Sequence, residues 1–172
     1  MGDFGKDTFL GEDYPDIRRA VDKVCEDFPG RYWREVDKAG AYPKAFVEAL
    51  TQAGWLSALI PKDYGGAGLP LRAAAVILET IHKSGASAAA CHAQMYTMGT
   101  LLRHGSESQK QEYLPEVASG KLRLQAFGVT EPSSGSDTTS LGTRATKKGD
   151  SYVVNGQKVW TSRAFYSDLM LL

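Results

Sequence analysis

The stretch Leu124-Gln125-Ala126-Phe127-Gly128-Val129 decides how the chain is divided, because the spacing of its apolar residues changes there. Before Leu122, apolar side chains recur at the spacing of amphipathic helices. After it, short β-rich runs follow one another with turn residues between them. The sequence therefore predicts an α+β chain, with an all-α helical bundle domain at residues 1–122 and the beginning of an antiparallel β-barrel or β-sandwich domain at residues 123–172.

The first part of the chain has the marks of several helices. One helix stops at Pro29-Gly30, a second opens at Pro43 and ends at Gly54, and a third begins near Leu71. The faces expected to be buried are Ile17, Ala20, Val21, Val24, Cys25 and Phe28 in the first, Phe46, Val47, Leu50 and Ala53 in the second, and Ala74, Ala75, Leu78 and Ile81 in the third.

A central helix is expected at residues 88–102, because this segment contains no charged residue and has no clean polar face. Such a helix should be covered by protein on nearly all sides. Ser106 and Gln109 have the spacing of a capping box for the helix that follows. Pro115 is expected to kink or restart that helix, and Gly120 to end it.

The β part contains one strong turn signal. Asn155-Gly156 lies between two β-rich runs, and this pair favours a type I′ hairpin turn because both positions need positive φ. The pattern predicts a hairpin with strands at residues 151–154 and 158–161. The apolar run at residues 168–172 predicts another strand, and its unpaired edge leads us to expect that the natural chain continues.

Composition excludes several classes of function. Hydrophobic residues make up 42% of the chain and charged residues 23%, which is typical of a globular protein. The 20 basic and 20 acidic residues balance, so neither a nucleic-acid partner nor a membrane partner is expected. The first ten residues from Met1 lack a signal or transit pattern, which favours a cytoplasmic protein.

Cysteine and histidine give no sign of a metal site. Cys25 and Cys91 lie among apolar residues and are expected to be buried thiols. His82, His92 and His104 lack the spacing of zinc ligands, so we expect them at helix surfaces or helix ends and predict no metal.

The segment Gly128-Val129-Thr130-Glu131-Pro132-Ser133-Ser134-Gly135-Ser136-Asp137 leads from a strand into a loop of small hydroxyl residues and glycine. Its N–H and hydroxyl groups can bind a phosphate at close range. The spacing matches neither the P-loop nor the G-x-G-x-x-G pattern, so the residues alone favour a plain surface turn. Glu131 and Asp137 are expected to accept backbone N–H bonds that fix the loop rather than to act as an acid/base pair.

This segment resembles the V-T-E-P-x-x-G-S-D signature of the acyl-CoA dehydrogenase family. Three further segments are similar to family segments and occur in the same order: P-K-D-Y-G-G-A-G at residues 61–68, H-G-S-E-S-Q-K-Q-E-Y-L-P at 104–115 and N-G-Q-K-V-W-T-S at 155–162. Together they span most of the chain. The resemblance implies the N-terminal helical domain and the start of the middle β domain of that family.

The resemblance also implies half of an FAD site. Phe127, Val129 and Thr130 would contact the isoalloxazine, and Ser136 would face the pyrophosphate. Trp160 would pack on the flavin, with the Ser162 hydroxyl near N5; many relatives have threonine at that position. On a strand, side chains two residues apart project from one face. The residues implied to bind FAD are Phe127, Val129, Thr130, Gly135, Ser136, Trp160, Thr161 and Ser162.

An acyl-CoA thioester is the implied substrate. Ser136 would contact its pantetheine, and Met95, Tyr96, Met98 and Gly99 on the central helix would line an acyl-chain tunnel. By itself, a stripe of methionine and aromatic residues is more often plain core.

The implied reaction is the FAD-dependent α,β-dehydrogenation of an acyl-CoA, as in fatty acid β-oxidation. Electrons would pass to an electron-transfer flavoprotein, and the protein would form a homotetramer or dimer. The family's catalytic glutamate lies in a later helical domain that no residue here matches, so the isolated chain is expected to be inactive. The alternatives are an acyl-CoA oxidase or flavin monooxygenase of the same fold, or a non-catalytic helical interaction module.

Overall fold

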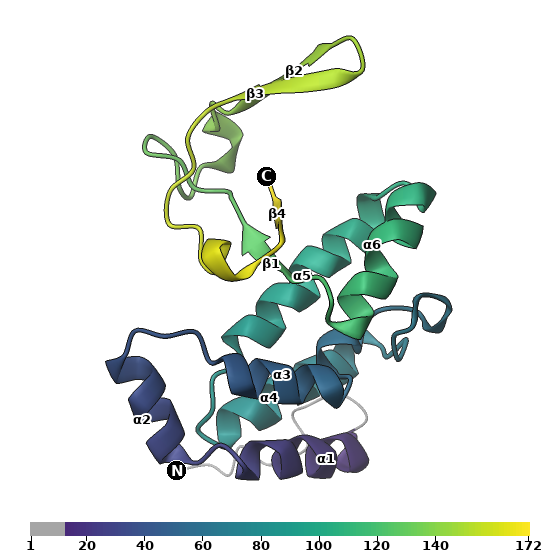
Figure 1. Cartoon of the computed structure of the whole chain (residues 1–172), viewed down its shortest axis with the longest axis vertical. Helices are drawn as coiled ribbons and strands as arrows, with labels where there is room; N and C mark the ends of the chain where they lie inside the picture. Colours follow the sequence, from purple (N-terminus) through teal and green to yellow (C-terminus); the bar gives the residue numbers. More distant parts are fainter. Residues whose placement is uncertain (1–12) are drawn as a thin grey trace, which may run out of the picture.

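The computed structural model describes residues 13–172 and contains a helical unit followed by a small β region (Figure 1). The expectation about a leader at the first ten residues lies outside this range. The predicted fold class is confirmed. The helices are α1 (Pro15–Glu26), α2 (Gly30–Lys38), α3 (Lys44–Gln52), α4 (Leu71–Lys83), α5 (Ala89–His104) and α6 (Glu107–Ser119), and the strands are β1 (Leu124–Phe127), β2 (Arg144–Lys148), β3 (Ser151–Asn155) and β4 (Leu169–Leu171).

One hydrophobic core holds the helical unit together. Phe46 on α3 is buried and packs edge-to-face with Phe28 and Trp33, with ring centroids 5.1 and 4.9 Å apart. Edge-to-face packing of this kind adds to the stabilisation that burial of apolar area provides. Cys25 and Cys91 are buried free thiols, as predicted.

Helix α2 was missed by the sequence prediction, which read Pro29-Gly30 only as a stop. Pro29 is the N-cap of α2, with φ −67° and ψ 168°. A proline that ends one helix is also well suited to the start of the next, because it has no N–H to leave unpaired. Three alanines expected in the core are exposed, namely Ala20, Ala53 and Ala75. Burial of a single methyl group contributes little free energy, so alanine is found in either environment.

The central helix α5 is less enclosed than predicted. Most of its side chains are buried, but His92, Tyr96 and Thr100 are exposed. Their spacing of four residues places them on one stripe of the helix. The described chain therefore covers α5 on all but one side.

Both ends of α6 follow the sequence prediction. The Ser106 hydroxyl accepts from the Gln109 amide, and the Gln109 side chain accepts from the Ser106 amide, which completes the capping box. Gly120 ends the helix with φ 76°. A side chain there would be strained, and its Cβ would lie 2.3 Å from Thr51 Cγ2. The helix continues through Pro115 without restarting.

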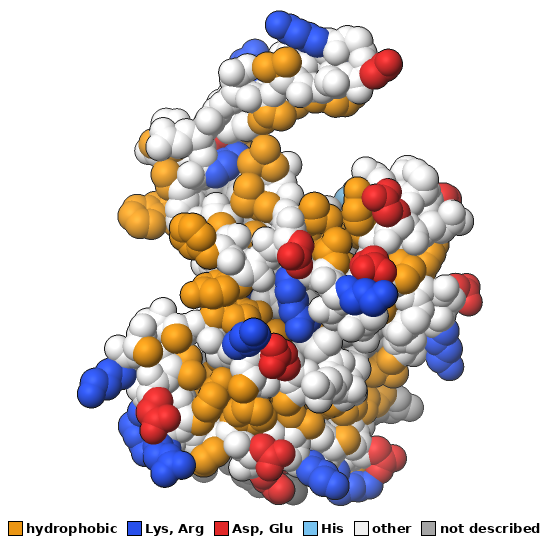
Figure 2. All heavy atoms as spheres, viewed as in Figure 1, with side chains coloured by type: hydrophobic (Ala, Val, Ile, Leu, Met, Phe, Trp, Pro, Cys, Tyr) orange, Lys and Arg blue, Asp and Glu red, His pale blue; other side chains and the backbone are white. Residues whose placement is uncertain are grey.

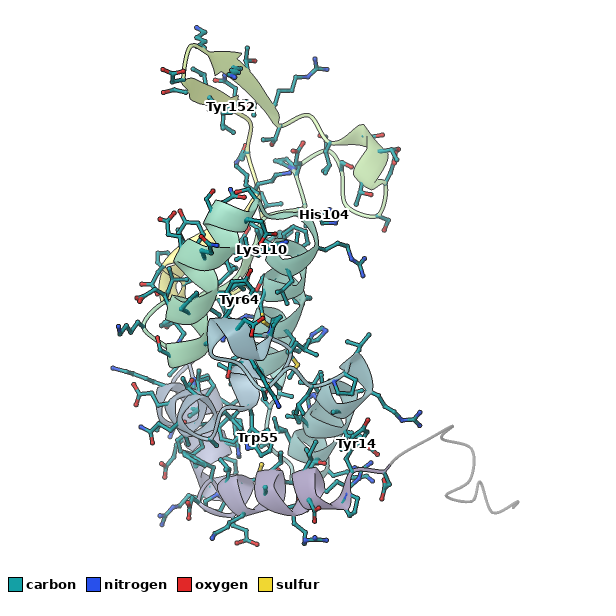
Figure 3. The ribbon with its side chains drawn as sticks, turned by 90° about the vertical axis from the view of Figure 1, so that its right-hand side faces the viewer. Tyr14, Trp55, Tyr64, His104, Lys110 and Tyr152 are labelled. Atoms are coloured by element: carbon teal, nitrogen blue, oxygen red, sulfur yellow. The ribbon has the colours of Figure 1, made fainter. Side chains whose placement is uncertain are left out.

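The loop at residues 61–68 packs closely against its neighbours. A Cβ on Gly66 would lie 2.1 Å from the Ile60 carbonyl oxygen, so only glycine fits there. Tyr64 Oη donates to Glu107 Oε2 at 3.3 Å and Lys110 Nζ donates to Glu107 Oε1 at 2.8 Å. Tyr64 and Lys110 are labelled in Figure 3. The loop is thereby tied to the first turn of α6.

The hairpin differs from the predicted one. Strands β2 and β3 pair antiparallel, with Lys148 opposite Ser151, so the turn is Gly149-Asp150. Only the glycine of Asn155-Gly156 has positive φ, and residues 158–161 form no strand. Gly156 is instead a point of close approach, where a Cβ would lie 2.1 Å from Thr143 Oγ1.

The hairpin extends away from the helices as an arm, with Tyr152 on it and Tyr14 at the opposite end of the molecule (Figures 1 and 3). Strand β4 pairs with β1, and the pairing is parallel. Hydrophobic side chains are exposed along this part of the chain (Figure 2). No helix among residues 13–172 is long and apolar enough to cross a bilayer.

A buried row of polar side chains fixes β1 on the helical unit. Tyr42 Oη donates to Gln125 Oε1 at 2.7 Å, and Gln125 Nε2 donates to Gln94 Oε1 at 3.2 Å. Gln94 Nε2 donates in turn to the Leu56 carbonyl at 3.3 Å. Gln94 and Gln125 are fully buried, and buried polar groups are costly unless they are paired in this way.

Replacing Gln125 by leucine should therefore destabilise the chain. Gln125→Leu leaves the Tyr42 hydroxyl and the Gln94 carbonyl oxygen without a partner, and the expected loss is about 1–3 kcal/mol in the free energy of unfolding. Urea unfolding followed by circular dichroism measures it. The control is Gln157→Leu at an exposed position, expected within about 0.5 kcal/mol of wild type. Equal losses for the two variants would contradict the role given to this row.

Candidate functional site

The Glu131 carboxylate joins three segments of the β region. Its Oε2 accepts from the Gly142 amide at 2.6 Å, and its Oε1 accepts from the Thr143 amide and from Lys158 Nζ, both at 2.9 Å. The side chains of Glu131 and Lys158 are only 5% and 11% exposed. The expectation that Glu131 fixes the loop is confirmed, and the carboxylate also pairs with a lysine that the sequence analysis did not single out.

These partners favour the ionised carboxylate strongly. The neighbouring Thr143 hydroxyl, then Lys158, then the Gly142 and Thr143 amides lower the pKa of Glu131 from 4.5 to about 2. Thr143 Oγ1 has no hydrogen-bond partner among residues 13–172, so the hydrogen bonds that the carboxylate accepts come from Lys158 and the two amides. A group with so low a pKa is poorly suited to general acid/base catalysis at neutral pH.

Lys158 also connects the loop entry to the segment that carries Trp160. Its Nζ donates a second hydrogen bond, to the Val129 carbonyl at 2.9 Å. One residue further on, the Val159 amide donates to the Thr130 carbonyl at 2.9 Å. The two segments that the resemblance places around one cofactor are therefore in direct contact.

These contacts leave hydrogen-bond donors at the end of β1. The carbonyls of Val129 and Thr130 are both used inside the protein. The two amides and the Thr130 hydroxyl donate to no acceptor within residues 13–172. Both residues are half-buried. This short segment therefore presents donors, and no unpaired backbone acceptor, to whatever lies beside it.

The loop after Glu131 is held by its own side chains. The Glu131 and Ser134 backbones exchange hydrogen bonds of 2.8 and 3.1 Å, and the Ser134 hydroxyl donates to the Asp137 carbonyl. The Ser140 and Thr139 hydroxyls and the Thr139 amide lower the pKa of Asp137. The expectation that Asp137 fixes the loop is thereby confirmed.

Gly135 and Ser136 are exposed at the tip of this loop. A Cβ on Gly135 would lie 4.0 Å from Thr130 Cγ2, so the loop tip and the donor segment are neighbours. The roles of both residues toward a pyrophosphate stay predictions.

Trp160 and Arg163 adopt left-handed backbone conformations, each with φ 60°. Non-glycine residues in this region are strained and occur frequently at functional sites. The Trp160 side chain is 87% exposed, while Thr161 is half-buried and Ser162 is exposed. Because no strand forms here, the argument that Trp160 and Ser162 project from one strand face is wrong.

The residues predicted to contact substrate are divided between two environments. Met95 and Met98 are buried in the core, which is the plain packing role. Tyr96, 36% exposed, lies on the open stripe of α5, and a Cβ on Gly99 would have no neighbour within 4 Å. The Tyr96 ring is 5.9 Å from that of Phe127, which is 42% exposed, and 5.2 Å from that of His92. A predicted substrate residue thus contacts a predicted cofactor residue.

A separate pocket of roughly 230 Å³ lies at the junction of the helical unit with residues 163–166, lined in part by Tyr42, Ser87, Arg163 and Tyr166. The rings of Tyr42 and Tyr166 stack there, with centroids 4.5 Å apart. No predicted cofactor residue lines this pocket. Within residues 13–172, no group of three or more histidine, cysteine or acidic side chains is arranged to hold a metal ion.

Lys158 and the amides of Gly142 and Thr143 are the site residues that the sequence analysis missed. A signal for the lysine was present. Lys158 is the single charged residue between positions 151 and 162, and Glu131 is the single charged residue between 124 and 136. Two isolated opposite charges in otherwise uncharged segments are candidates for a buried pair. No local pattern marks the amides, because their role depends on where the chain returns.

Comparison with known proteins identifies the family to which the chain belongs. The family model of the acyl-CoA dehydrogenase N-terminal domain matches residues 11–121, and that of the acyl-CoA dehydrogenase middle domain matches residues 126–172. The chain belongs to the acyl-CoA dehydrogenase family. The change from one model to the next falls where the helical unit gives way to β1.

Similar proteins include enzymes with several substrates. Cyclohex-1-ene-1-carbonyl-CoA dehydrogenase of Syntrophus aciditrophicus is 37% identical over 137 residues, which are 79% of this chain and 33% of that protein. The 3-(aryl)acrylate reductase of Clostridium sporogenes is 34% identical over 166 residues, 95% of this chain and 44% of that protein. The crystal structure of an acyl-CoA dehydrogenase from Geobacillus kaustophilus matches 94% of this chain and 43% of its own, with a TM-score of 0.82 and 29% identity. The chain thus spans less than half the length of these relatives.

The depressed pKa of Glu131 leads to a prediction about stability and pH. The folded-state pKa of about 2 lies below the ordinary 4.5, so the stabilisation is complete above about pH 4.5 and disappears as the pH falls toward 2. Glu131→Gln should be less stable than wild type at pH 7, and the difference should shrink as the pH falls. Urea midpoints between pH 7 and 2.5 measure it.

The control for this series is Glu26→Gln at an exposed position, which should stay close to wild type throughout. A gap between Glu131→Gln and wild type that is the same at pH 7 and pH 3 would show that the ionised carboxylate is not what stabilises the loop.

Proposed function

We propose that the 127–137 and 158–162 segments form part of the FAD site of an enzyme that oxidises acyl-CoA thioesters by α,β-dehydrogenation. The observation that carries this proposal is the row of unpaired donors at Val129 and Thr130, which the contacts of Lys158 and Val159 bring beside the segment that carries the exposed Trp160. Family membership supports the same assignment.

The residues present fit a flavin. An isoalloxazine has two apolar ring faces and an edge of carbonyl oxygens and ring nitrogens, most of which accept hydrogen bonds. The donors of Val129 and Thr130 suit that edge, and the exposed rings of Trp160 and Phe127 suit the faces. When bound, FAD supplies the acceptor for the hydride that leaves the acyl β-carbon. Ser162 adds a hydroxyl donor for N5, and the glycine and hydroxyl groups at 135–136 suit the pyrophosphate.

Substrate is expected on the open stripe of α5. Tyr96 and Gly99 lie there, and the ring contact of Tyr96 with Phe127 connects this stripe to the proposed flavin surface. Two relatives carry a ring in the substrate that their names give, so ring-bearing acyl-CoA esters are the first compounds to try. Removal of the α-proton is assigned to no residue of this chain, because Glu131 and Asp137 are both committed to holding the loop.

The remaining parts of the proposal follow from the family. The electrons would pass to an electron-transfer flavoprotein, and the protein would work as a homo-oligomer in the cytoplasm, in fatty acid β-oxidation or a related acyl-CoA pathway. Reoxidation of the reduced flavin by an electron-transfer flavoprotein rather than by air separates a dehydrogenase from an oxidase.

Trp160 provides a direct test of FAD binding. The purified chain mixed with FAD should quench flavin fluorescence, and Trp160→Ala should weaken binding roughly 3–10-fold, the range expected for loss of one aromatic contact. Phe165→Ala is the matched control, because Phe165 is an aromatic residue 99% exposed in the next turn of the chain and should leave the dissociation constant unchanged. A chain that takes up no FAD, or equal effects of the two substitutions, would contradict the proposed site.

A further inference from the structure

Lys158 has a role that the proposed function does not by itself require. Its side chain is only 11% exposed, and its ammonium group has two acceptors, the Val129 carbonyl and Glu131 Oε1. Its side chain passes Gly128 closely, since a Cβ on that glycine would lie 3.3 Å from Lys158 Cγ. Burying a lysine is costly unless it is paired, so the contacts define one position for this side chain.

The first acceptor determines which groups the end of β1 can offer. A backbone carbonyl must be paired when it is shielded from water, and Lys158 satisfies that of Val129. The Val159 amide does the same for Thr130. With both carbonyls used, the amides and the Thr130 hydroxyl remain. Lys158 therefore makes this segment a hydrogen-bond donor.

The second acceptor removes a negative charge from the neighbourhood. Glu131 is ionised at neutral pH, since its pKa is about 2. Without the ammonium group, the carboxylate next to Thr130 would be uncompensated. Both contacts therefore act in the same direction, because they remove acceptors and negative charge from the segment that faces the proposed cofactor.

We propose that Lys158 is a positioning residue that sets the hydrogen-bond polarity of the flavin-facing segment, so that the site favours the more negative, reduced form of the cofactor. This inference rests on the proposed function. An anion is stabilised by preorganised donors, and a free Val129 carbonyl or an unpaired Glu131 would oppose it.

The first part of the experiment needs no cofactor. Amide hydrogen exchange of the wild-type chain should show protection at Gly142, Thr143 and Val159, whose amides are paired in this cluster. In Lys158→Met, exchange at these three amides should be about tenfold faster or more, as expected for the loss of hydrogen bonds to a charged group. Lys158→Arg, which keeps the charge, should recover part of the protection.

Two controls show whether the effect is local. Lys121→Met removes a lysine whose side chain is 70% exposed and should change nothing in the cluster. Amides in α4 and α5 should exchange as in wild type in all variants. Unchanged protection of the three cluster amides in Lys158→Met would overturn the inference, whether or not the chain binds FAD.

The second part compares the two redox states of the cofactor. FAD and anaerobically reduced FAD are titrated separately into each variant. Lys158→Met should weaken binding of the reduced form about tenfold more than that of the oxidised form, corresponding to about one charge-assisted hydrogen bond, with Lys158→Arg in between. Equal weakening of both forms would mean that Lys158 only stabilises the fold, and would overturn the inference. A wild-type chain that binds neither form would contradict the proposed function, while the exchange measurement still decides whether Lys158 holds the segment.

Discussion

The β region depends on the buried pair of Glu131 and Lys158. One carboxylate accepts from the amides of Gly142 and Thr143, and one ammonium group donates to it and to the Val129 carbonyl. Three segments far apart in sequence meet at these few atoms. Few apolar side chains are buried in this part of the chain, so hydrogen bonds and charge take the place of a core. A cluster of this kind loses much if any one member is removed.

The helical unit, in contrast, is stabilised by an apolar core. The row of polar side chains formed by Tyr42, Gln125 and Gln94 attaches β1 to it. Because β1 is fixed on α5, the residues that follow it start from a defined position beside the open stripe of that helix. The helical unit thus holds β1 rigidly, and β1 fixes the position at which the following loop begins. The same strand places Phe127 in contact with Tyr96.

Local patterns predicted most of the helical unit and less of the β region. The capping box at Ser106 and the stop at Gly120 are local features, and the structure has them. Helix α2 was missed because a proline at a helix boundary can mark either the end of one helix or the start of the next. The hairpin was placed wrongly at Asn155-Gly156 because the strand that pairs with β3 is the polar, fully exposed run Arg144–Lys148, which has no apolar alternation to mark it. The roles of Glu131 and Asp137 were foreseen. Lys158 was missed although its isolated charge marked it as a candidate partner for Glu131, whereas the amides of Gly142 and Thr143 depend on a return of the chain that spacing cannot reveal.

The left-handed backbone of Trp160 has a consequence for attempts to make the protein more robust. A bulky residue in this conformation costs roughly 1–2 kcal/mol relative to one in an ordinary region, and glycine would relieve that cost. A search for thermostable variants would thus tend to select against the indole at this position. Stability and cofactor affinity are thus in competition at a single residue, and variants chosen only for heat resistance would hold the proposed cofactor more weakly.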